Sequence, residues 1–382
     1  MFEATVDHLT EGNRATDHMP RIDLPRRHRV DDSLEVGTRI REAGRDVFSV
    51  VSRSTGRPLA NDSLYSYIIG LINHVRERAA LAAKGGAQSM SMAAEQPVDR
   101  ISLADTLKIH RVSGSEFLAP IRPTATPRIF GGVTAGQAVL AALATVTSDR
   151  RIHALQATFL RPGTGDAPVT YHTDHLHDGG SLTTRLVTAT QYDRTIFTAT
   201  ASFHRSENGL AHQIPTLSAP EPEKVAPAAS ALSDDAVNLS WLSAIEQNFM
   251  LEFRFPDTPI RVSTTRGVTV APRQQFWVRP RGPLPDDQSA HAAVLAYLSD
   301  VLLLSTSLGP HGKTLQDPGM RFATVNHTIW FHSPAPADDW LLYEQEGIWA
   351  GSARAVCRGS IFRRSGELAA TVMQEGLIQV SA

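Results

Sequence analysis

The chain has 382 residues, with 37 basic and 39 acidic side chains and a formal charge of −2 at pH 7. This balance gives no bulk attraction to nucleic acid or to anionic membranes, so charge predicts neither partner. The single cysteine, Cys357, cannot form an internal disulfide, which favours a reducing compartment and predicts a cytoplasmic location. The first residues, MFEATVDHLTEGNR, are acidic and polar and do not resemble a secretory signal.

Residues 1–100 form an N-terminal extension with the weakest structural signal. They contain one plausible helix near Asn61–Ala83 and the low-complexity run AAKGGAQSMSMAAEQP, which is typical of a linker. Three roles stay open for this extension: a flexible segment, a docking or oligomerising helix, or a small DNA-binding module. DNA binding is the least favoured, because acidic and basic residues nearly balance and no basic face is evident.

The pattern changes at residue 101 to a helix followed by strands. An apolar stretch after the turn RIFGG predicts a helix over Gly132–Thr147. Alternating apolar and polar residues, separated by Gly- and Asp-rich turns, then predict four strands. These strands span Arg151–Arg161, Val169–His177, Leu182–Gln191 and Thr195–His204. We assign residues 101–213 to a first structural repeat.

Residues 214–240 are rich in Pro and Ala and predict a linker with no core to bury. Residues 241–382 then form a second repeat. Its expected elements are strands near Phe249–Phe255 and Gln275–Arg279, a helix over His291–Leu308, and strands at Ala323–His332, Trp340–Glu346, Ala353–Arg363 and Glu367–Ile378. The apolar run 292–308 is too short and too polar to span a membrane, so it predicts a buried core helix.

The two repeats are related in sequence. Residues 138–146 (AVLAALATV) match residues 293–301 (AVLAYLSDV), which places Thr145 opposite Asp300 at an offset of 300 − 145 = 155. A longer match of the following strands places Tyr171 opposite Tyr343, at an offset of 343 − 171 = 172. Self-similarity at this scale indicates two copies of one supersecondary unit, a dimer fused into one chain.

A helix that is apolar on nearly all sides requires a sheet that wraps around it. Two such units can join their sheets edge to edge, which removes two exposed strand edges. The sequence therefore predicts the α+β class and a double hot dog, in which two helices are each wrapped by an antiparallel sheet.

Asp300 is the strongest lead to chemistry. A carboxylate on an apolar helix must be partnered or neutralised, because burying it alone is costly. The fold alone does not require it, since the duplicate helix carries Thr145 at the same place. The structural alternative is an ion pair of Asp300 with an Arg or His across the core.

From about Ser102 to Gln379, the chain resembles acyl-CoA thioesterase II, the double-hot-dog thioesterase family. The matching stretches follow family order and include RIFGGVTAGQAVLAAL, FLRPG, HDGGSLTTRLVTATQ, LAYLSD, NHTIWFHSP, WLLYEQE, ARAVCRGSIF and GELAATVMQEGLI. One departure is Asn326, where family members often have aspartate. The resemblance implies hydrolysis of fatty acyl-CoA to free acid and CoA, without a covalent intermediate and without a cofactor.

The resemblance also implies a catalytic trio of Asp300, Thr324 and Gln374. Asp300 would accept a proton from the attacking water, Thr324 would hold that water, and Gln374 would orient the water or the carbonyl. The repeat offsets place Ile152 and Ser202 at the positions of Thr324 and Gln374. The first repeat would therefore be a non-catalytic scaffold.

Substrate contacts and metal binding complete the expected site. Gly131 and Gly132 at the start of the first helix could offer backbone N–H groups to the substrate. Arg321 could meet the phosphates of CoA. No metal is expected, because His327 and His332 would point to opposite faces of one strand.

Other functions are less favoured. The sequence contains no G-x-S-x-G elbow, P-loop or dinucleotide fingerprint. A hot-dog hydratase would be expected to have a histidine where Ser305 lies. The remaining alternative is a non-catalytic acyl-CoA-binding or regulatory protein with an N-terminal docking or DNA-binding module. Exposed sheet faces and edges further predict a homo-oligomer, either a dimer or a tetramer.

Overall fold

The computed structural model describes residues 102–121, 128–216 and 218–381, together with four short strands nearer the N-terminus. The chain divides into two units, Met1–Gln96 and Pro97–Ala382. In the first unit β1 pairs with β4 and β2 pairs with β3, both antiparallel. Their bounds are β1 Leu34–Val36, β2 Ile40–Glu42, β3 Arg45–Val47 and β4 Val50–Ser52. The helix expected near Asn61–Ala83 lies outside the described residues.

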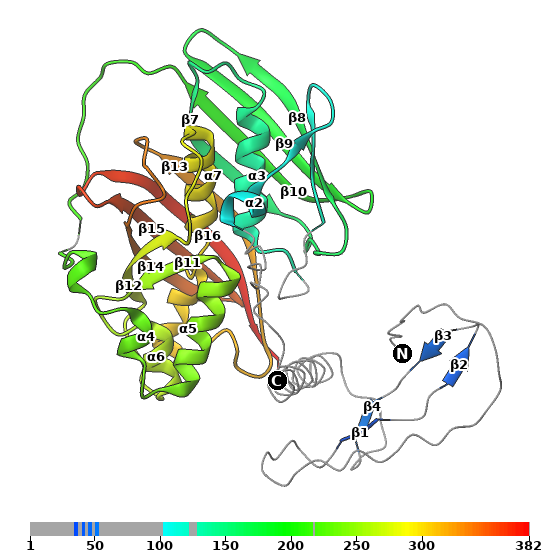
Figure 1. Ribbon diagram of the computed structural model, residues 1–382, viewed down its shortest axis with the longest axis vertical. Coiled ribbons are helices and arrows are strands. Elements are labelled where there is room, and N and C mark those ends of the chain that lie inside the picture. The colour runs from blue at the N-terminus through cyan, green and yellow to red at the C-terminus, as the bar shows by residue number, and fades with distance from the viewer. Residues whose placement is uncertain are drawn as a thin grey trace, which may run out of the picture. The chain divides into compact units, whose positions relative to one another are not determined.

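One antiparallel sheet of twelve strands dominates the second unit (Figure 1). The strands of the first repeat are β5 His110–Arg111, β6 Glu116–Ala119, β7 Arg151–Phe159, β8 Val169–Asp178, β9 Leu182–Gln191 and β10 Arg194–His204. Those of the second are β11 Leu251–Arg254, β12 Arg273–Pro280, β13 Met320–Phe331, β14 Leu341–Gly351, β15 Arg354–Arg363 and β16 Leu368–Val380. The alternating sequence patterns thus form strands close to where they were predicted.

The two repeats meet at a seam between β7 and β13. Read outward from this seam, the strand order is β7-β10-β9-β8-β6-β5 on one side and β13-β16-β15-β14-β12-β11 on the other. The order is therefore the same in both repeats, which confirms the predicted edge-to-edge joining of two duplicated sheets. Even the irregularities match, because β10 and β7 shift register after Ser202 and β16 and β13 shift register after Thr324.

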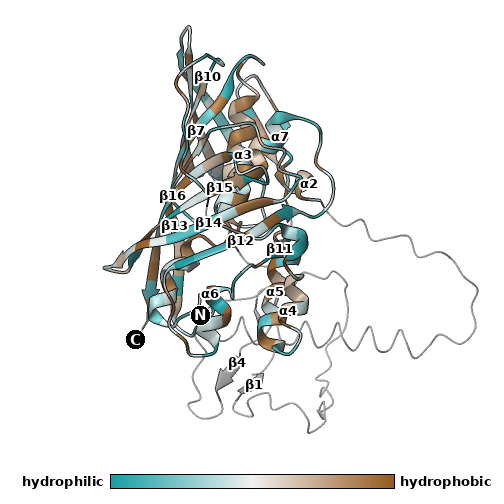
Figure 2. Cartoon of the chain, turned by 90° about the vertical axis from the view of Figure 1, so that its left-hand side faces the viewer, coloured by the Kyte–Doolittle hydropathy of each residue, from teal (hydrophilic) through white to brown (hydrophobic). Residues whose placement is uncertain are grey.

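Two central helices, α3 (Gly131–Leu143) and α7 (Gln288–Ser299), lie side by side against the same face of the sheet (Figures 1 and 2). Glycines permit their close approach. A Cβ on Gly132 would come within 2.5 Å of the Tyr297 carbonyl oxygen, and one on Gly136 within 2.8 Å of the Ala293 carbonyl oxygen. Residues 293–299 of α7 are all buried, as expected for a helix enclosed by sheet and helix.

The expected continuous helix over His291–Leu308 is wrong beyond Ser299. Asp300 is the C-cap of α7, and Leu302 takes a left-handed conformation with φ of 60°. A residue with that backbone cannot continue a right-handed helix. The chain turns there and resumes as the 3₁₀ helix η2, Leu304–His311. Asp300 consequently lies at a helix end and not within a helix.

Residues 288–311 are together long and apolar enough to cross a membrane by length and composition alone. In the described structure, 78% of the most apolar window of this stretch is buried inside the protein. This burial agrees with the core position predicted from the sequence.

The linker expected at 214–240 is wrong in one respect, because this segment does bury a core. It contains η1 (Pro222–Lys224), α4 (Ala228–Ala231) and the start of α5 (Ala236–Asn248). The segment packs on the sheet in a small cluster made of Val225, Trp277, Trp340, Leu342 and Phe362. Leu342 and the core residue Tyr343 are adjacent in β14, so this cluster lies on the face opposite the central helices. The short helices α2 (Leu103–Leu107) and α6 (Ile260–Thr265) were also not expected.

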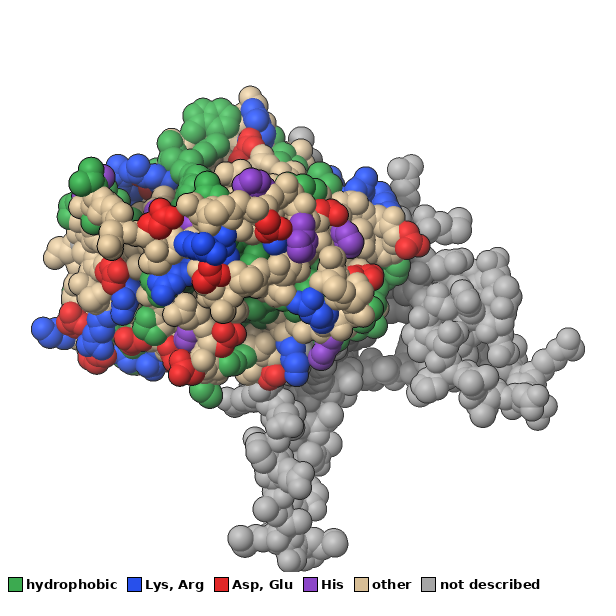
Figure 3. Space-filling view, turned by 90° about the horizontal axis from the view of Figure 1, so that it is seen from above, with side chains coloured by type: hydrophobic (Ala, Val, Ile, Leu, Met, Phe, Trp, Pro, Cys, Tyr) green, Lys and Arg blue, Asp and Glu red, His purple; other side chains and the backbone are tan. Residues whose placement is uncertain are grey.

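The surface of the described residues carries charges of both signs. On the face shown in Figure 3, Lys and Arg side chains alternate with Asp and Glu side chains, and several histidines lie among them. This mixture agrees with the nearly balanced composition of the chain.

Candidate active site

The three side chains of the predicted trio come together in the structure. Asp300 is at the end of α7, Thr324 is on β13, and Gln374 is on the neighbouring strand β16. The hydroxyl of Thr324 donates to Asp300 Oδ1 at 3.3 Å. The amide nitrogen of Gln374 donates to the same oxygen at 2.5 Å and to Thr324 Oγ1 at 2.7 Å. One carboxylate oxygen is thus held by two uncharged donors.

The alternative interpretation of Asp300, an ion pair across the core, is contradicted. Among the described residues, no salt bridge joins Asp300 to a Lys, Arg or His side chain. Its side chain is half-buried, whereas Gln374 is only 2% exposed. A carboxylate with neutral partners and access to solvent can accept a proton during a reaction.

The second oxygen of Asp300, Oδ2, faces the start of α3 from the other repeat. A Cβ on Gly131 would lie 2.7 Å from Oδ2 and 3.3 Å from the ring of Phe159. The N-cap residue Phe130 makes no side-chain capping bond, so the first N–H groups of α3 are not covered by a cap. The site therefore combines a carboxylate from the second repeat with the positive end of a helix dipole from the first.

Gly132 and Arg321 do not have the same relation to the trio. The missing side chain of Gly132 makes room for the Tyr297 carbonyl oxygen, so this glycine serves the packing of α3 on α7. Arg321 is exposed and lies three residues before Thr324 in β13, which places it on the opposite face of the sheet. Asn326 also points away from the trio, because it bonds to Thr158 across the seam and to Glu375.

A group of buried polar residues behind Asp300 was missed by the sequence analysis. Ser299 bonds through its hydroxyl to the ring of His327 at 2.7 Å and through its carbonyl oxygen to the Tyr343 hydroxyl at 2.6 Å. Burial lowers the pKa of His327, although the nearby charge of Asp300 acts in the opposite direction. Burial also raises the pKa of the Tyr343 hydroxyl well above its usual range, so that group stays protonated. The repeat offsets could have identified Ser299 and His327, since their counterparts are Ala144 and Leu155, but not Tyr343, whose counterpart is also a tyrosine.

In the first repeat, an arginine side chain occupies the place that corresponds to the trio. Arg185 corresponds to Cys357, because 357 − 185 = 172. Its side chain is 3% exposed and forms an ion pair with Asp178 at 2.7 Å. It also donates to the hydroxyl and the carbonyl oxygen of Thr145, the residue equivalent to Asp300. The first repeat therefore has a buried guanidinium where the second has its trio.

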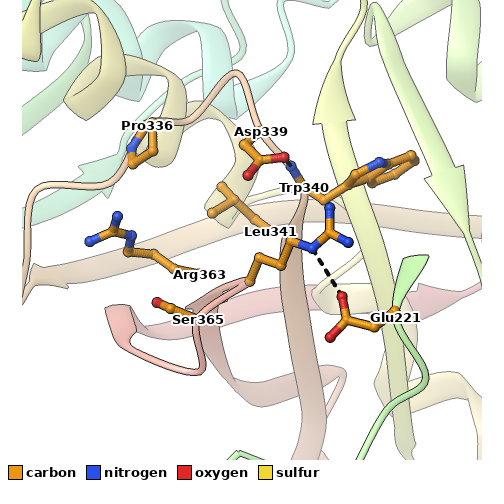
Figure 4. A pocket seen from close by; sticks show the side chains of 8 residues that line it. Glu221, Pro336, Asp339, Trp340, Leu341, Arg363 and Ser365 are labelled. Carbon is orange, nitrogen blue, oxygen red and sulfur yellow. Dashed lines mark hydrogen bonds and ion pairs between the residues drawn. The ribbon is translucent and has the colours of Figure 1, made fainter. Parts of the chain in front are cut away.

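Two surface cavities lie away from the trio. One of about 500 Å³ is open to solvent and is shown in Figure 4. It is lined by Glu221, Pro336, Asp339, Trp340, Leu341, Arg363, Arg364 and Ser365. Arg363 pairs with Glu367, and Arg364 pairs with Glu221 and Glu223. Both arginines are thus paired with carboxylates, so neither brings an unpaired positive charge to this cavity.

Within the described ranges, no group of three or more His, Cys, Asp or Glu side chains could hold a metal ion. His327 is buried toward the central helices, whereas His332 is exposed and bonds to Thr371. The two histidines therefore do not converge on one point.

Both repeats match models of known protein families. Residues 118–204 match the model described as acyl-CoA thioesterase N-terminal domain, and residues 244–377 match the model described as acyl-CoA thioesterase. The second match contains the whole trio.

Similar proteins cover most of the second unit. Acyl-coenzyme A thioesterase 8 of Mus musculus is 36% identical over 268 residues, which are 66% of this chain and 81% of that protein. Acyl-CoA thioesterase 2 of Haemophilus influenzae is 32% identical over 73% of this chain and 98% of its own length.

Solved structures also resemble this chain. The crystal structure of an acyl-CoA thioesterase II from Mycobacterium marinum aligns with a TM-score of 0.60 and 32% identity, over 73% of this chain and 98% of its own. A hot-dog-fold protein from Alicyclobacillus acidocaldarius aligns with a TM-score of 0.59 at 19% identity, with the same coverage of both chains. At that identity the second likeness bears on the fold alone, and it supports the hot-dog architecture.

Proposed function

The chain belongs to the acyl-CoA thioesterase family, and we propose that its hydrolytic site lies at the end of α7, where Asp300 activates water. The family makes it a thioester hydrolase, which converts acyl-CoA and water to a carboxylic acid and CoA. The observation that carries the proposed site is the meeting of Asp300, Thr324 and Gln374 beside Gly131 at the start of α3.

Asp300 Oδ2 is the base in this proposal. Oδ1 already accepts hydrogen bonds from Thr324 and Gln374, so Oδ2 is the oxygen left to receive a proton from water. The water oxygen attacks the thioester carbon, and the negative charge that forms on the carbonyl oxygen is stabilised by N–H groups at the start of α3. When the intermediate collapses, the C–S bond breaks and the proton returns from Asp300 to the leaving sulfur. One water is consumed, and acid and thiol are released.

Thr324 and Gln374 hold the base in this scheme. Both N–H groups of the Gln374 amide are used, one toward Asp300 and one toward Thr324. The Thr324 hydroxyl hydrogen is used toward Asp300 as well. The network therefore supports a role for both residues in orienting the carboxylate of Asp300. The attacking water is held by Oδ2 of Asp300 in this scheme.

The environment of Cys357 supports a direct attack by water. This thiol is buried, and burial raises its pKa, so the nucleophilic thiolate is disfavoured. The hydrogen bond that the sulfur accepts from Thr306 acts in the opposite direction, but burial has the larger effect. A covalent acyl intermediate on Cys357 is accordingly not part of the proposal.

An apolar pair next to the trio supports a fatty acyl substrate. Phe322 and Ile378 are cross-strand partners in β13 and β16, and strand alternation places both on the same face as Thr324 and Gln374. Phe322 is 43% exposed, so an acyl chain that leaves the trio in this direction would cover apolar surface now in contact with water.

We also propose a cytoplasmic location, which the unpaired, buried Cys357 supports. CoA is the only partner that the proposed site requires besides the acyl group. The docking or DNA-binding role considered for residues 1–100 has no observation in its favour among the described residues.

Replacing Asp300 tests the proposed site. Asp300→Asn keeps the size of the side chain and removes the base, so kcat for acyl-CoA hydrolysis should fall by roughly a hundredfold or more. The matched control is Thr145→Ala at the equivalent position of the first repeat, which should keep kcat within about twofold of wild type. Circular dichroism and a melting curve would establish that both variants are folded. Near-normal turnover by folded Asp300→Asn would reject the mechanism.

A further inference from the structure

Both residues that flank Asp300 are held through their carbonyl oxygens by side chains of one strand. The Tyr343 hydroxyl donates to the Ser299 carbonyl oxygen at 2.6 Å, and the Gln345 amide donates to the Val301 carbonyl oxygen at 2.7 Å. Tyr343 and Gln345 both come from β14 and are 0% and 3% exposed. The end of α7 is therefore fixed to the sheet on each side of the carboxylate.

His327 adds a third attachment, through the Ser299 side chain. The Ser299 hydroxyl has one hydrogen and is placed to donate it to the Ala296 carbonyl oxygen at 2.8 Å. The bond of 2.7 Å to His327 Nε2 is then best made with the ring N–H as donor. This tautomer leaves Nδ1 as an acceptor, and Nδ1 has no partner among the described residues. Because burial lowers the pKa of His327, the neutral ring is the stable form.

One of these attachments, that of His327, joins two elements that carry the trio, α7 and β13, and the other two tie the end of α7 to β14 of the same sheet. His327 is on β13, where it lies directly opposite Gln374 of β16, and Thr324 is three residues earlier in the same strand. A shift of the α7 end relative to β13 would change the contact of 3.3 Å between Thr324 and Asp300. The attachments therefore control the distance on which the proposed site depends.

The first repeat lacks this arrangement although it has the same fold. At the offsets of 155 and 172, Ser299 corresponds to Ala144, His327 to Leu155 and Gln345 to Thr173. Tyr171 is the counterpart of Tyr343, but its hydroxyl donates to the side chain of Gln137 and not to a helix end. The three attachments are thus not a requirement of the repeat, and they occur only beside the carboxylate.

We propose that His327, Tyr343 and Gln345 form a buried clamp that positions Asp300 for proton transfer. The clamp residues are positioning residues, since each acts through Ser299 or Val301 and none touches the carboxylate in the structure. This proposal rests on the proposed function, because it assigns the clamp to the same site.

The two equivalent tyrosines provide a matched experiment. Tyr343→Phe and Tyr171→Phe each remove one hydroxyl hydrogen bond from a fully buried side chain, so both should lower the melting temperature by a similar amount. Only Tyr343→Phe should lower kcat, by about tenfold or more, with KM within about twofold of wild type, since misplacing a reacting group by about 1 Å costs up to a hundredfold. Equal kcat values for the two variants would overturn the clamp.

His327 allows a second test that depends on one atom. In His327→Gln the amide nitrogen reaches the position of Nε2 and can still donate to Ser299, whereas in His327→Asn it reaches only the position of Nδ1. We expect His327→Gln to keep kcat within about threefold, and His327→Asn to lose about tenfold or more at unchanged KM. Equal losses in both variants would overturn the role of this hydrogen bond. Ser299→Ala, which removes the acceptor, replaces His327→Asn if that variant does not fold.

The same variants in an Asp300→Asn background separate the two proposals. If the clamp acts through Asp300, Tyr343→Phe should reduce the residual kcat of Asp300→Asn by less than twofold. An unchanged tenfold loss in that background would overturn the clamp and leave the assignment of Asp300 intact. High activity of Asp300→Asn itself would overturn the proposed function instead.

Discussion

The strand pairing makes Ala201 of β10 the counterpart of Gln374 of β16, because Gln374 lies opposite His327 and Cys357, and Ala201 lies opposite Leu155 and Arg185. The offset of 172, which matched Gln374 to Ser202, is therefore wrong by one residue in this strand. Gln374 carries an amide that reaches Asp300, whereas Ala201 has no polar group on its side chain. Thr145 and Asp300 form a second such pair at the ends of α3 and α7. At the scale of single residues, the difference between scaffold and active site is therefore a few side chains on a common backbone.

Alanine substitutions in the two repeats should show the asymmetry directly. Thr324→Ala and Gln374→Ala each remove a donor to Asp300 and should lower kcat by about ten- to a hundredfold, with a smaller change in KM. Ser202→Ala and Thr145→Ala should leave both constants close to wild type. Steady-state kinetics with a single acyl-CoA would measure all four. Comparable losses of kcat from the substitutions in the first and in the second repeat would mean that the first repeat also takes part in the chemistry.

The two glycines at the start of α3 should respond differently to alanine. In Gly131→Ala the new methyl group would enter the space beside Asp300 Oδ2, so we expect a large fall in kcat with little loss of stability. In Gly132→Ala it would meet the Tyr297 carbonyl oxygen at 2.5 Å, so we expect destabilisation by about 1–3 kcal/mol from forced separation of α3 and α7. Urea unfolding and kcat measured on both variants would decide. The reverse pattern would contradict these assigned roles.

At the scale of elements, the strands could be predicted and the turns between them only in part. The period-two patterns of β9 and β15 are regular, and these strands begin 354 − 182 = 172 residues apart, as the internal match required. The end of α7 could not be predicted in the same way. No glycine or proline marks the change at Leu302, and the turn is held by hydrogen bonds from β14, which is distant in sequence.

The fold of segment 214–240 could not be predicted from its composition. Its Pro- and Ala-rich composition favours an extended linker. Val225 is nevertheless only 8% exposed, because it packs against Trp277 of β12 and against Trp340, the residue before β14. Such burial depends on the partner surface and has no periodic signature in the segment itself. The candidate site could also be predicted only in part. The internal duplication pointed to Asp300, and the family resemblance added Thr324 and Gln374. Neither indicated His327 as a positioning residue.

At the scale of the whole molecule, buried histidines link folding to pH. Burial lowers the pKa values of His153 and His327 below the ordinary 6.5. Below about pH 6.5 the unfolded chain takes up protons that the folded chain does not, so the unfolded state is favoured as the pH falls. Stability from these groups is therefore present above pH 6.5 and is lost toward acid. Carboxylates such as Asp178, with pKa values below 3.8, act only at lower pH.

We expect the free energy of unfolding to decrease between about pH 7.5 and pH 5.5, and to decrease less in His327→Gln, which has one titrating group fewer. Urea unfolding of both proteins across that range is the measurement. Parallel curves for wild type and variant would show that His327 does not contribute to the linkage.

Self-association is a further prediction at this scale. The last part of β14 exposes Ile348 and Trp349, at 50% and 46%, and the described strands of the sheet end at β5 on one side and β11 on the other. Exposed apolar side chains and strand edges are commonly covered in symmetric oligomers. We expect the full chain, and a chain shortened to begin at residue 101, to scatter light as dimers or larger. If the shortened chain were monomeric at micromolar concentration while the full chain associates, residues 1–100 would be responsible for assembly.

The seam between β7 and β13 has a consequence for inheritance. If the two repeats were separate identical subunits, one gene would encode both, and every substitution would appear on each side of the pseudo-symmetry axis. An arginine at the position of Arg185 would then be present in both halves, including the one that carries the active site. Replacing Asp300 in one half would likewise remove it from both. Because the hydrogen-bonded halves belong to one polypeptide, each was free to diverge alone. One half could give up chemistry for a buried ion pair while the other kept its carboxylate.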